Sequence, residues 1–247
     1  MNNKNAFTLA EVLITLGIIG VVAAITIPTL INNYKKMHYV NKFKHTYSLL
    51  QQAIGMSQVE NGPLDTWDYS ENPEEEENLT KFAEKYITPY LKIAKNCGTR
   101  TGEGCLPEKV MLLNGNEWPY GGTDNDISYK VVLSNGVPIT IDYKQNCTEN
   151  KTYCIGITAH TDGLKKQTTM GRDYFLFDAF PGLNQIYPRG IYPNSTGSYS
   201  YLNTDENGNW IKRTKEEIEA KCCNSSQCNG GDWCGGRILF DGYKMNY

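Results

Sequence analysis

The amino-acid sequence predicts an α+β protein in which a long N-terminal helix packs on an antiparallel β-sheet head, with a disulfide-rich C-terminal region. Three observations carry this prediction. Residues 7–31 are almost entirely apolar, and residues 32–59 continue them with an amphipathic helical pattern. Apolar residues alternate with polar ones after residue 127. All eight cysteines follow residue 96. The 247 residues are ample for one domain with its own core and an extension.

The composition limits the classes of function. Basic residues number 24 against 27 acidic ones, and the net charge of −3 argues against a nucleic-acid-binding surface. The common enzyme motifs G-x-S-x-G and H-E-x-x-H, the P-loop and a Rossmann glycine fingerprint are absent from the sequence. The three histidines, His38, His45 and His160, are scattered. We therefore expect a protein that is not an enzyme and has no catalytic residues.

Residues 7–31 form the first half of the predicted helix. They are apolar except for Glu11 and four threonines, and as a helix they span about 37 Å, enough to cross a hydrocarbon core of ~30 Å. A secretory signal cleaved after Ala24 is an alternative. Glu11 interrupts the apolar run, however, and the helical pattern continues past the cleavage point, so a membrane-spanning helix is preferred.

Residues 32–59 continue the same helix as an amphipathic segment. Apolar side chains recur every three or four positions, at Tyr34, Met37, Val40, Phe43, Tyr47, Leu50 and Ile54. Lysine, asparagine and glutamine fill the positions between them, with His38 and His45 on the polar faces. Pro28 lacks the amide that would bond to Ala24, so a kink is expected there.

The N-terminus resembles that of type IV prepilins and of the pseudopilins of type II secretion. In that family a short polar leader and a small residue precede Phe-Thr-Leu-x-Glu, which opens an apolar helix. The sequence AFTLAEVLITLGIIGVVAAITIP places Phe7, Thr8, Leu9 and Glu11 at these positions after a six-residue leader. Ala6 stands where the family usually has glycine.

The resemblance implies a processing and assembly mechanism. Residues 1–6 would be a leader, removed on the cytoplasmic side by a prepilin peptidase that cuts between Ala6 and Phe7 and methylates the new amine of Phe7. Glu11 would pair with the N-terminus of a neighbouring subunit. Residues 7–31 would then be the transmembrane and filament-core segment, residues 32–59 its amphipathic continuation, and residues 60–247 an extracytoplasmic head.

The same resemblance implies a structural subunit of a type IV pilus or a type II secretion pseudopilus. Its partners would be other pilin or pseudopilin subunits, the prepilin peptidase, the inner-membrane assembly platform and the membrane itself. We expect a single pass through the bacterial inner membrane with the head outside the cytoplasm, then a place in the filament or at the cell surface.

The lysines after the span favour the opposite orientation, but clustered cysteines favour an oxidising compartment. A membrane-tethered, adhesin-like binding module that recognises partners through residues 182–209 is the alternative.

The cysteines are expected to form disulfides. Their number is even, their spacings are short and no C-x-x-C occurs, which disfavours the rival interpretation of a zinc site in the last four. Local pairs Cys97–Cys105 and Cys147–Cys154 are predicted. The adjacent Cys222 and Cys223 pair with Cys228 and Cys234 in one of two orders.

The head is predicted to contain a second helix and several strands. Asn72, Pro73 and the following glutamates signal a helix start, and we expect this helix to run to about Lys95, with Pro89 kinking or ending it. Asn135-Gly136 between two alternating segments predicts a β-hairpin over residues 127–143. Further strands are expected over residues 153–158, 174–177 and 237–244, a short helix over 215–221, and an irregular loop over 182–209.

The segment from His160 to Phe175 is similar to a loop of pilin-like heads with the pattern Asp-x-Asn-Gly, Lys, Pro-Asn, Gly-x-Asp-x-Phe. His160 and Gln167-Thr168 depart from this pattern. In major pseudopilins a neighbouring loop holds calcium. Asp162 and Asp173 are candidate calcium ligands here, fewer than a calcium site uses, so an Asp-Gly turn and a salt-bridged aspartate are preferred. No cofactor is otherwise expected.

Overall fold

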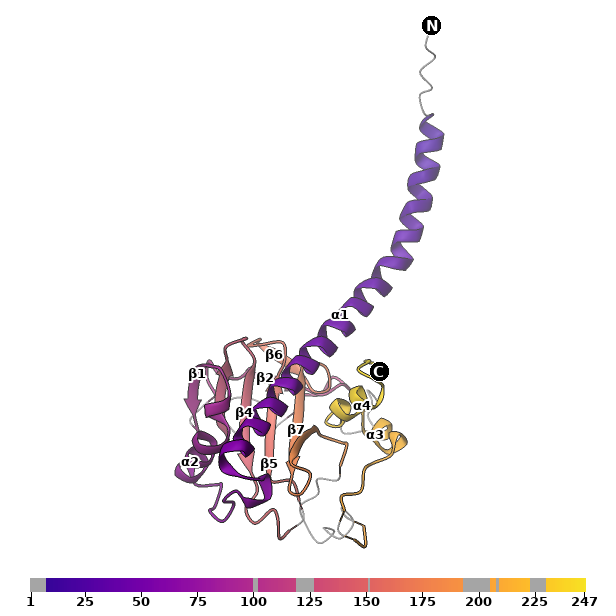
Figure 1. Cartoon of the computed structure of the whole chain (residues 1–247). Helices are drawn as coiled ribbons and strands as arrows, with labels where there is room; N and C mark the ends of the chain where they lie inside the picture. Colours follow the sequence, from indigo (N-terminus) through magenta and orange to yellow (C-terminus); the bar gives the residue numbers. More distant parts are fainter. Residues whose placement is uncertain are drawn as a thin grey trace. The chain divides into compact units, whose positions relative to one another are not determined.

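The computed structural model describes residues 8–99, 102–118, 127–150, 152–192, 205–207, 209–222 and 230–247 (Figure 1). The chain divides into two compact units, Met1–His38 and Tyr39–Tyr247. One helix, α1 (Leu9–Asn61), belongs in part to each. The long helix predicted from the sequence is therefore confirmed, whereas the finer division into residues 1–6, 7–31, 32–59 and 60–247 stays a prediction.

In the first unit, α1 exposes apolar side chains on every side. Leu9, Leu13, Ile19 and Ile25 are 77%, 61%, 62% and 70% exposed. The helix is continuous through Pro28. Within the described residues it is the one helix long and apolar enough to cross a membrane.

The second unit is built on a six-stranded antiparallel sheet in the order β1-β3-β4-β5-β7-β8. The strands are β1 (Ile93–Gly98), β3 (Tyr129–Leu133), β4 (Pro138–Tyr143), β5 (Ile155–His160), β7 (Tyr174–Phe180) and β8 (Gln185–Pro188). Two short strands, β2 (Lys109–Met111) and β6 (Gln167–Thr169), pair in parallel as a separate sheet. The antiparallel head is therefore confirmed.

The predicted hairpin is the β3–β4 pair. Gly136 has a φ of +82°, which a turn of this kind requires and which glycine adopts freely. The amide of Leu133 donates to the carbonyl of Val137 at 2.9 Å. The strands predicted over residues 153–158 and 174–177 correspond to β5 and β7.

The core lies between one face of the sheet and the part of α1 from Tyr39 onward (Figure 1). Phe43 is fully buried, with its ring 4.7 Å from that of Phe175 and 5.7 Å from that of Phe177. Burial of one such side chain contributes about 1.5–3 kcal/mol. The predicted apolar stripe is thus the core-facing side of α1 from Val40 to Ile54.

The second helix ends before Pro89, one of the two outcomes expected at this proline, and does not reach Lys95. Helix α2 covers Glu76–Tyr86, a 3-10 turn η2 covers Thr88–Tyr90, and β1 follows. Pro89 explains the difference, because proline lacks an amide and disfavours helical geometry in the residue before it. The helix start is also later. The Asn72 side chain accepts a hydrogen bond from the amide of Glu74 at 3.1 Å, whereas Glu75 is the N-cap of α2.

The predicted strand over residues 237–244 is wrong, because α4 (Cys234–Phe240) occupies its first part. A short apolar run does not distinguish a strand from a helix. Two glycines let this helix approach its neighbours closely. A Cβ on Gly235 would lie 3.1 Å from the Cβ of Pro188, and one on Gly236 would lie 3.1 Å from the carbonyl oxygen of Arg189.

Helix α3 and the segment over residues 182–209 differ in how well the sequence predicted them. Helix α3 (Lys215–Lys221) has the predicted bounds, and Thr214 and Glu217 close its first turn as a capping box. Residues 182–209 are not wholly irregular, since they contain β8. Residues 193–204 and 208, nearly half of the proposed recognition surface, lie outside the described residues.

Candidate functional site

The start of α1 is built by reciprocal hydrogen bonds between Thr8 and Glu11. The Oε2 atom of Glu11 accepts from the backbone amide and the hydroxyl of Thr8, both at 2.8 Å. The amide of Glu11 in turn donates to Thr8 Oγ1 at 3.3 Å. This arrangement is a capping box, and it places the first helical residue at Leu9. Sequence reasoning missed this role, although the T-x-x-E spacing was the available signal.

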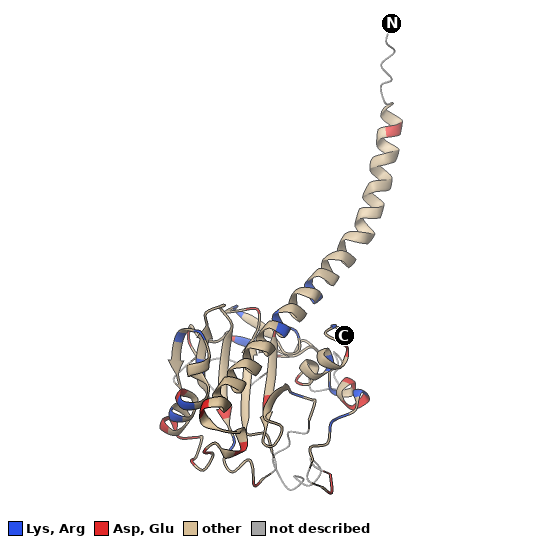
Figure 2. Ribbon diagram, in the orientation of Figure 1, with Lys and Arg blue, Asp and Glu red and all other residues tan. Residues whose placement is uncertain are grey.

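Glu11 is also the one acidic residue of α1 before Glu60. Figure 2 shows one acidic position near the start of α1 and basic positions only further along this helix. An unpaired carboxylate in hydrocarbon costs several kcal/mol, so such a group needs a partner there. Ala6 and Phe7, the predicted cleavage and methylation positions, lie outside the described residues.

The threonine hydroxyl groups of the apolar segment form hydrogen bonds with backbone carbonyls of the preceding helical turn. Thr26 Oγ1 donates to the carbonyl of Val22 at 2.9 Å, and Thr29 Oγ1 donates to that of Ile25 at 3.5 Å. A hydroxyl bonded to the preceding turn carries little desolvation penalty in an apolar setting. The threonines therefore need no partner outside the helix. Glu11 is the charged group of this segment, and in an apolar setting it needs an external partner.

Three disulfides hold the head together. Cys97–Cys105 and Cys147–Cys154 have the predicted pairing, and Cys222 is bonded to Cys234. The Cys222–Cys234 bond rules out a zinc site that uses all four C-terminal cysteines. Cys223 and Cys228 lie outside the described residues.

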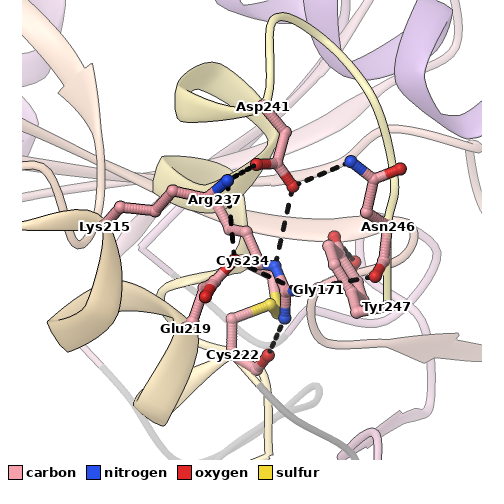
Figure 3. A network of polar contacts seen from close by, with 9 residues as sticks. All are labelled: Gly171, Lys215, Glu219, Cys222, Cys234, Arg237, Asp241, Asn246 and Tyr247. Atoms are coloured by element: carbon pink, nitrogen blue, oxygen red, sulfur yellow. Dashed lines mark hydrogen bonds and ion pairs between the residues drawn. A yellow bond between two sulfur atoms is a disulfide. The ribbon is translucent and has the colours of Figure 1, made fainter.

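A polar network joins α3, α4 and the following chain (Figure 3). The carboxylate of Asp241, whose side chain is only 3% exposed, pairs with Lys215 Nζ at 3.1 Å and Arg237 Nε at 3.7 Å. It also accepts from the side-chain amide of Asn246 at 3.1 Å. Arg237 Nη1 donates to the carbonyl of Cys222 at 2.9 Å. The network therefore reinforces the disulfide at the same place.

Tyr247 is held by the same region of the head. Its hydroxyl donates to the carbonyl of Gly171 at 2.6 Å (Figure 3). Gly171 has a φ of +79°, and a Cβ at this residue would lie 2.8 Å from the sulfur of Cys234. Gly171 is therefore a glycine for both conformational and steric reasons.

The loop between His160 and Phe175 is a network of internal contacts. Asp162 pairs with Lys165, and Gly163 adopts a φ of +82° in the Asp-Gly turn. The buried Asp173 accepts from the amide of Thr169 at 2.5 Å, and burial raises the pKa of its carboxyl. Within the described residues, no group of three or more His, Cys, Asp or Glu side chains could hold a metal ion. Calcium binding stays a prediction, with the turn the better-supported interpretation.

His160, which takes the place of the first aspartate in this loop pattern, is buried at the end of β5. Its Nδ1 lies 3.1 Å from Thr168 Oγ1, and its ring meets that of Tyr174 edge-on at 4.8 Å. Burial lowers its pKa to about 3, so the ring is neutral at physiological pH. His45, in contrast, is exposed on α1.

Comparisons with known proteins give matches over both parts of the chain. The model of DUF6613, a family of unknown function, matches residues 29–247. The model of the prokaryotic N-terminal methylation motif matches residues 1–27. Prepilin peptidase-dependent protein D of Escherichia coli (strain K12) is 27% identical over 106 residues, which are 43% of this chain and 68% of that protein. No solved structure gives a significant match.

Proposed function

The chain belongs to DUF6613, a family of unknown function, and is a type IV pilin-like protein; on this premise we propose that it is a structural subunit of a type IV pilus or a type II secretion pseudopilus. The observation that carries the proposal is the coincidence of two features in residues 1–27. The methylation motif lies there, and so does the capped start of an apolar helix with a single carboxylate.

Processing creates the assembling form of the subunit. A prepilin peptidase removes residues 1–6 by cutting between Ala6 and Phe7, and the new amine of Phe7 is methylated. The methylation motif and the name of the Escherichia coli relative support this step. Alanine is small, like the glycine that usually precedes the cleaved bond, so the peptidase can accept it.

The exposed apolar surface of α1 sets where the subunit resides. Side chains such as Leu13 and Ile25 need an apolar environment on all sides. The inner membrane supplies it before assembly, and the helices of other subunits supply it in the filament. The three disulfides favour a head outside the cytoplasm, where cystines persist.

Glu11 provides a register signal during assembly. Its carboxylate pairs with the Phe7 amine of a neighbouring subunit, and this pairing removes the cost of an isolated charge in an apolar surrounding. The bonds from the Thr8 amide and hydroxyl both reach the same oxygen, Oε2. A carboxylate can accept about four hydrogen bonds, so Glu11 can cap its own helix and bind the neighbour's amine together.

The test is the N-terminus of the mature protein, read by Edman sequencing and intact mass from membranes and from sheared filaments. We expect a chain that begins with N-methylated Phe7, and retention of residues 1–6 in cells without prepilin peptidase. A start at Ile25 would identify a signal peptide. An intact Met1 in both fractions would instead support the membrane-tethered binding module.

A further inference from the structure

The face of the sheet that points away from α1 borders a cavity of about 610 Å³. Side chains alternate across a strand, so the residues between the core positions of β3, β4, β5 and β7 line this second face. They include Lys130, Thr140, Asp142, Thr158, His160 and Leu176. Most of this lining is polar, although Lys130, Thr140 and His160 are buried. Burying polar groups costs free energy that an apolar lining would avoid.

The strand register brings the polar groups together in rows. Thr140 pairs with Thr158 across β4 and β5, and their hydroxyl oxygens lie 2.5 Å apart. Asp142 pairs with Gly156 in the next row. The Asp142 carboxylate occupies the space above this glycine, since a Cβ there would lie 2.6 Å from Oδ1. A carboxylate and two hydroxyl groups thus lie on neighbouring positions of one surface.

The cationic groups of the cavity already have partners. Arg189 forms a two-point contact with the buried Asp178, with Nη2–Oδ1 at 2.7 Å and Nε–Oδ2 at 3.0 Å. Lys130 Nζ donates to the carbonyl of Ser128 at 2.9 Å. His160 is neutral because of its burial. Besides Arg189, the lining carries two lysines, Lys130 and Lys144, and three carboxylates, those of Glu74, Asp142 and Asp232. It therefore has no excess of positive charge that would select an anion.

Acceptors and aromatic rings complete the lining. Asp232 lines the cavity, and within the described part of the chain its buried Oδ1 accepts no hydrogen bond. Trp118 and Tyr174 add aromatic faces. Tyr153 also borders the space, but Arg189 and Lys144 lie 5.6 and 5.7 Å from its ring centroid. The Tyr153 ring therefore already makes cation–π contacts with side chains of the protein, and it is poorly suited to bind a cationic ligand.

We propose that this cavity binds a neutral saccharide of one or two rings, whose hydroxyl groups bond to Asp142, Thr140 and Thr158 and whose apolar face packs on Trp118 or Tyr174. A sugar offers hydroxyl donors and acceptors together with an apolar C–H face, which matches a charge-compensated lining of carboxylates, hydroxyls and rings. The volume lies within the roughly 300–1,000 Å³ of small-molecule sites. The head would then recognise a glycan in addition to its part in a filament.

The test uses the full-length protein in micelles of a detergent without a sugar headgroup, because a glycosidic detergent would compete. Saturation-transfer difference NMR is recorded with glucose, galactose, their N-acetylamino derivatives, lactose and maltose at millimolar concentration. Sialic acid and choline serve as an anionic and a cationic comparator. We expect at least one neutral sugar to bind and both comparators to fail.

Two cavity variants and two matched controls assign the site. Asp142→Asn should weaken binding about tenfold or more, the value of one hydrogen bond to a charged group. Trp118→Ala should also weaken binding, because the apolar face of the sugar loses the ring on which it packs. Asp65→Asn and Tyr34→Ala change exposed residues that do not line the cavity and should bind as the parent does. Trp118 is only half-buried, so its variant tests the site even if Asp142→Asn misfolds. Absence of sugar binding, preference for either comparator, or full binding by both Asp142→Asn and Trp118→Ala would overturn the proposal.

Discussion

Thr8 and Glu11 cap the first helix of the protein reciprocally, with two bonds of 2.8 Å to one oxygen of the Glu11 carboxylate. The residue proposed to pair with a neighbouring subunit is therefore also the residue that fixes where α1 begins. The two roles can be separated by substitution. Glutamine serves in a capping box as glutamate does, but it carries no charge to pair with an amine.

Glu11→Gln should consequently keep the helix start and lose assembly. Breaking a buried ion pair by removing one partner costs about 3–5 kcal/mol, which corresponds to a loss of incorporation of about 100-fold or more. Immunoblots of sheared filaments and membranes measure the two pools. Thr8→Val is the matched control, since it removes the cap at a cost of about 1 kcal/mol but keeps the charge. Parental amounts of Glu11→Gln in filaments would disprove the pairing.

The residue before the proposed cleavage site gives a second prediction. Ala6→Gly should mature at least as fast as the parent protein, because glycine is the usual residue at this position of the resembled family. Ala6→Leu should accumulate uncut precursor, because a bulky side chain replaces a small one at the scissile bond. A time course of precursor and mature bands measures both. Equal rates for all three proteins would show that the Ala6–Phe7 bond is not the one that is cut.

The Cys222–Cys234 bond leaves Cys223 and Cys228 as the remaining cysteines of the chain. We predict that they form a fourth disulfide, because an oxidising compartment does not favour free thiols. Intact mass before and after reduction should then differ by one hydrogen for each of the eight cysteines. Peptide mapping without reduction should recover a Cys223–Cys228 cross-link, and free thiols at these two residues would contradict the prediction.

Gly171 should be far less tolerant of substitution than Gly182. Both have positive φ values, +79° and +77°, so alanine costs about 1–2 kcal/mol at either through backbone strain. A Cβ on Gly171 also meets the sulfur of Cys234 at 2.8 Å, whereas a Cβ on Gly182 meets nothing within 4 Å. Gly171→Ala should cost a further 1–3 kcal/mol, roughly, as overpacked sites do. Urea unfolding measures the difference, and equal losses would refute the steric argument.

Elements with a strong local signal could be predicted from the sequence, and those that depend on distant partners could not. The apolar period of α1 and the Asn135-Gly136 turn are local signals, and both elements are present. Strand β1 has no alternating burial and exists through its pairing with β3. Helix α4 contains two glycines, which disfavour a helix. Its close packing against Pro188 and Arg189 is a tertiary contact, so the local sequence does not predict it.

The same distinction applies to the candidate sites. The motif around Phe7 and Glu11 is contiguous, so a sequence displays it completely. The polar cavity depends on the register that places Asp142 beside Gly156 and Thr140 beside Thr158. These residues are 14 to 18 positions apart in the chain and come together only when the strands pair. No pattern of spacing along the sequence predicts that they share one site.

The burial of His160 makes the stability of the head depend on pH. Its pKa is about 3 in the folded protein, against 6.5 for the ordinary side chain. Between these values the unfolded chain binds a proton that the folded chain excludes, so stability rises with pH and is fully present above about pH 6.5. The slope is at most about 1.4 kcal/mol per pH unit, so acidification from pH 7.5 to 5 should cost about 2 kcal/mol through this residue.

His160→Gln isolates this effect from that of other groups. Asp173 and Asp232 have pKa values raised by burial, so their protonation stabilises the fold on acidification and opposes the histidine. Their contribution is common to parent and variant and cancels in the difference between them. Urea unfolding at pH 7.5 and pH 5 should therefore show about 2 kcal/mol less acid destabilisation in His160→Gln than in the parent. His45→Gln, at an exposed position, should retain the parental pH dependence. Identical pH dependence in parent and His160→Gln would mean that His160 becomes protonated without loss of the fold.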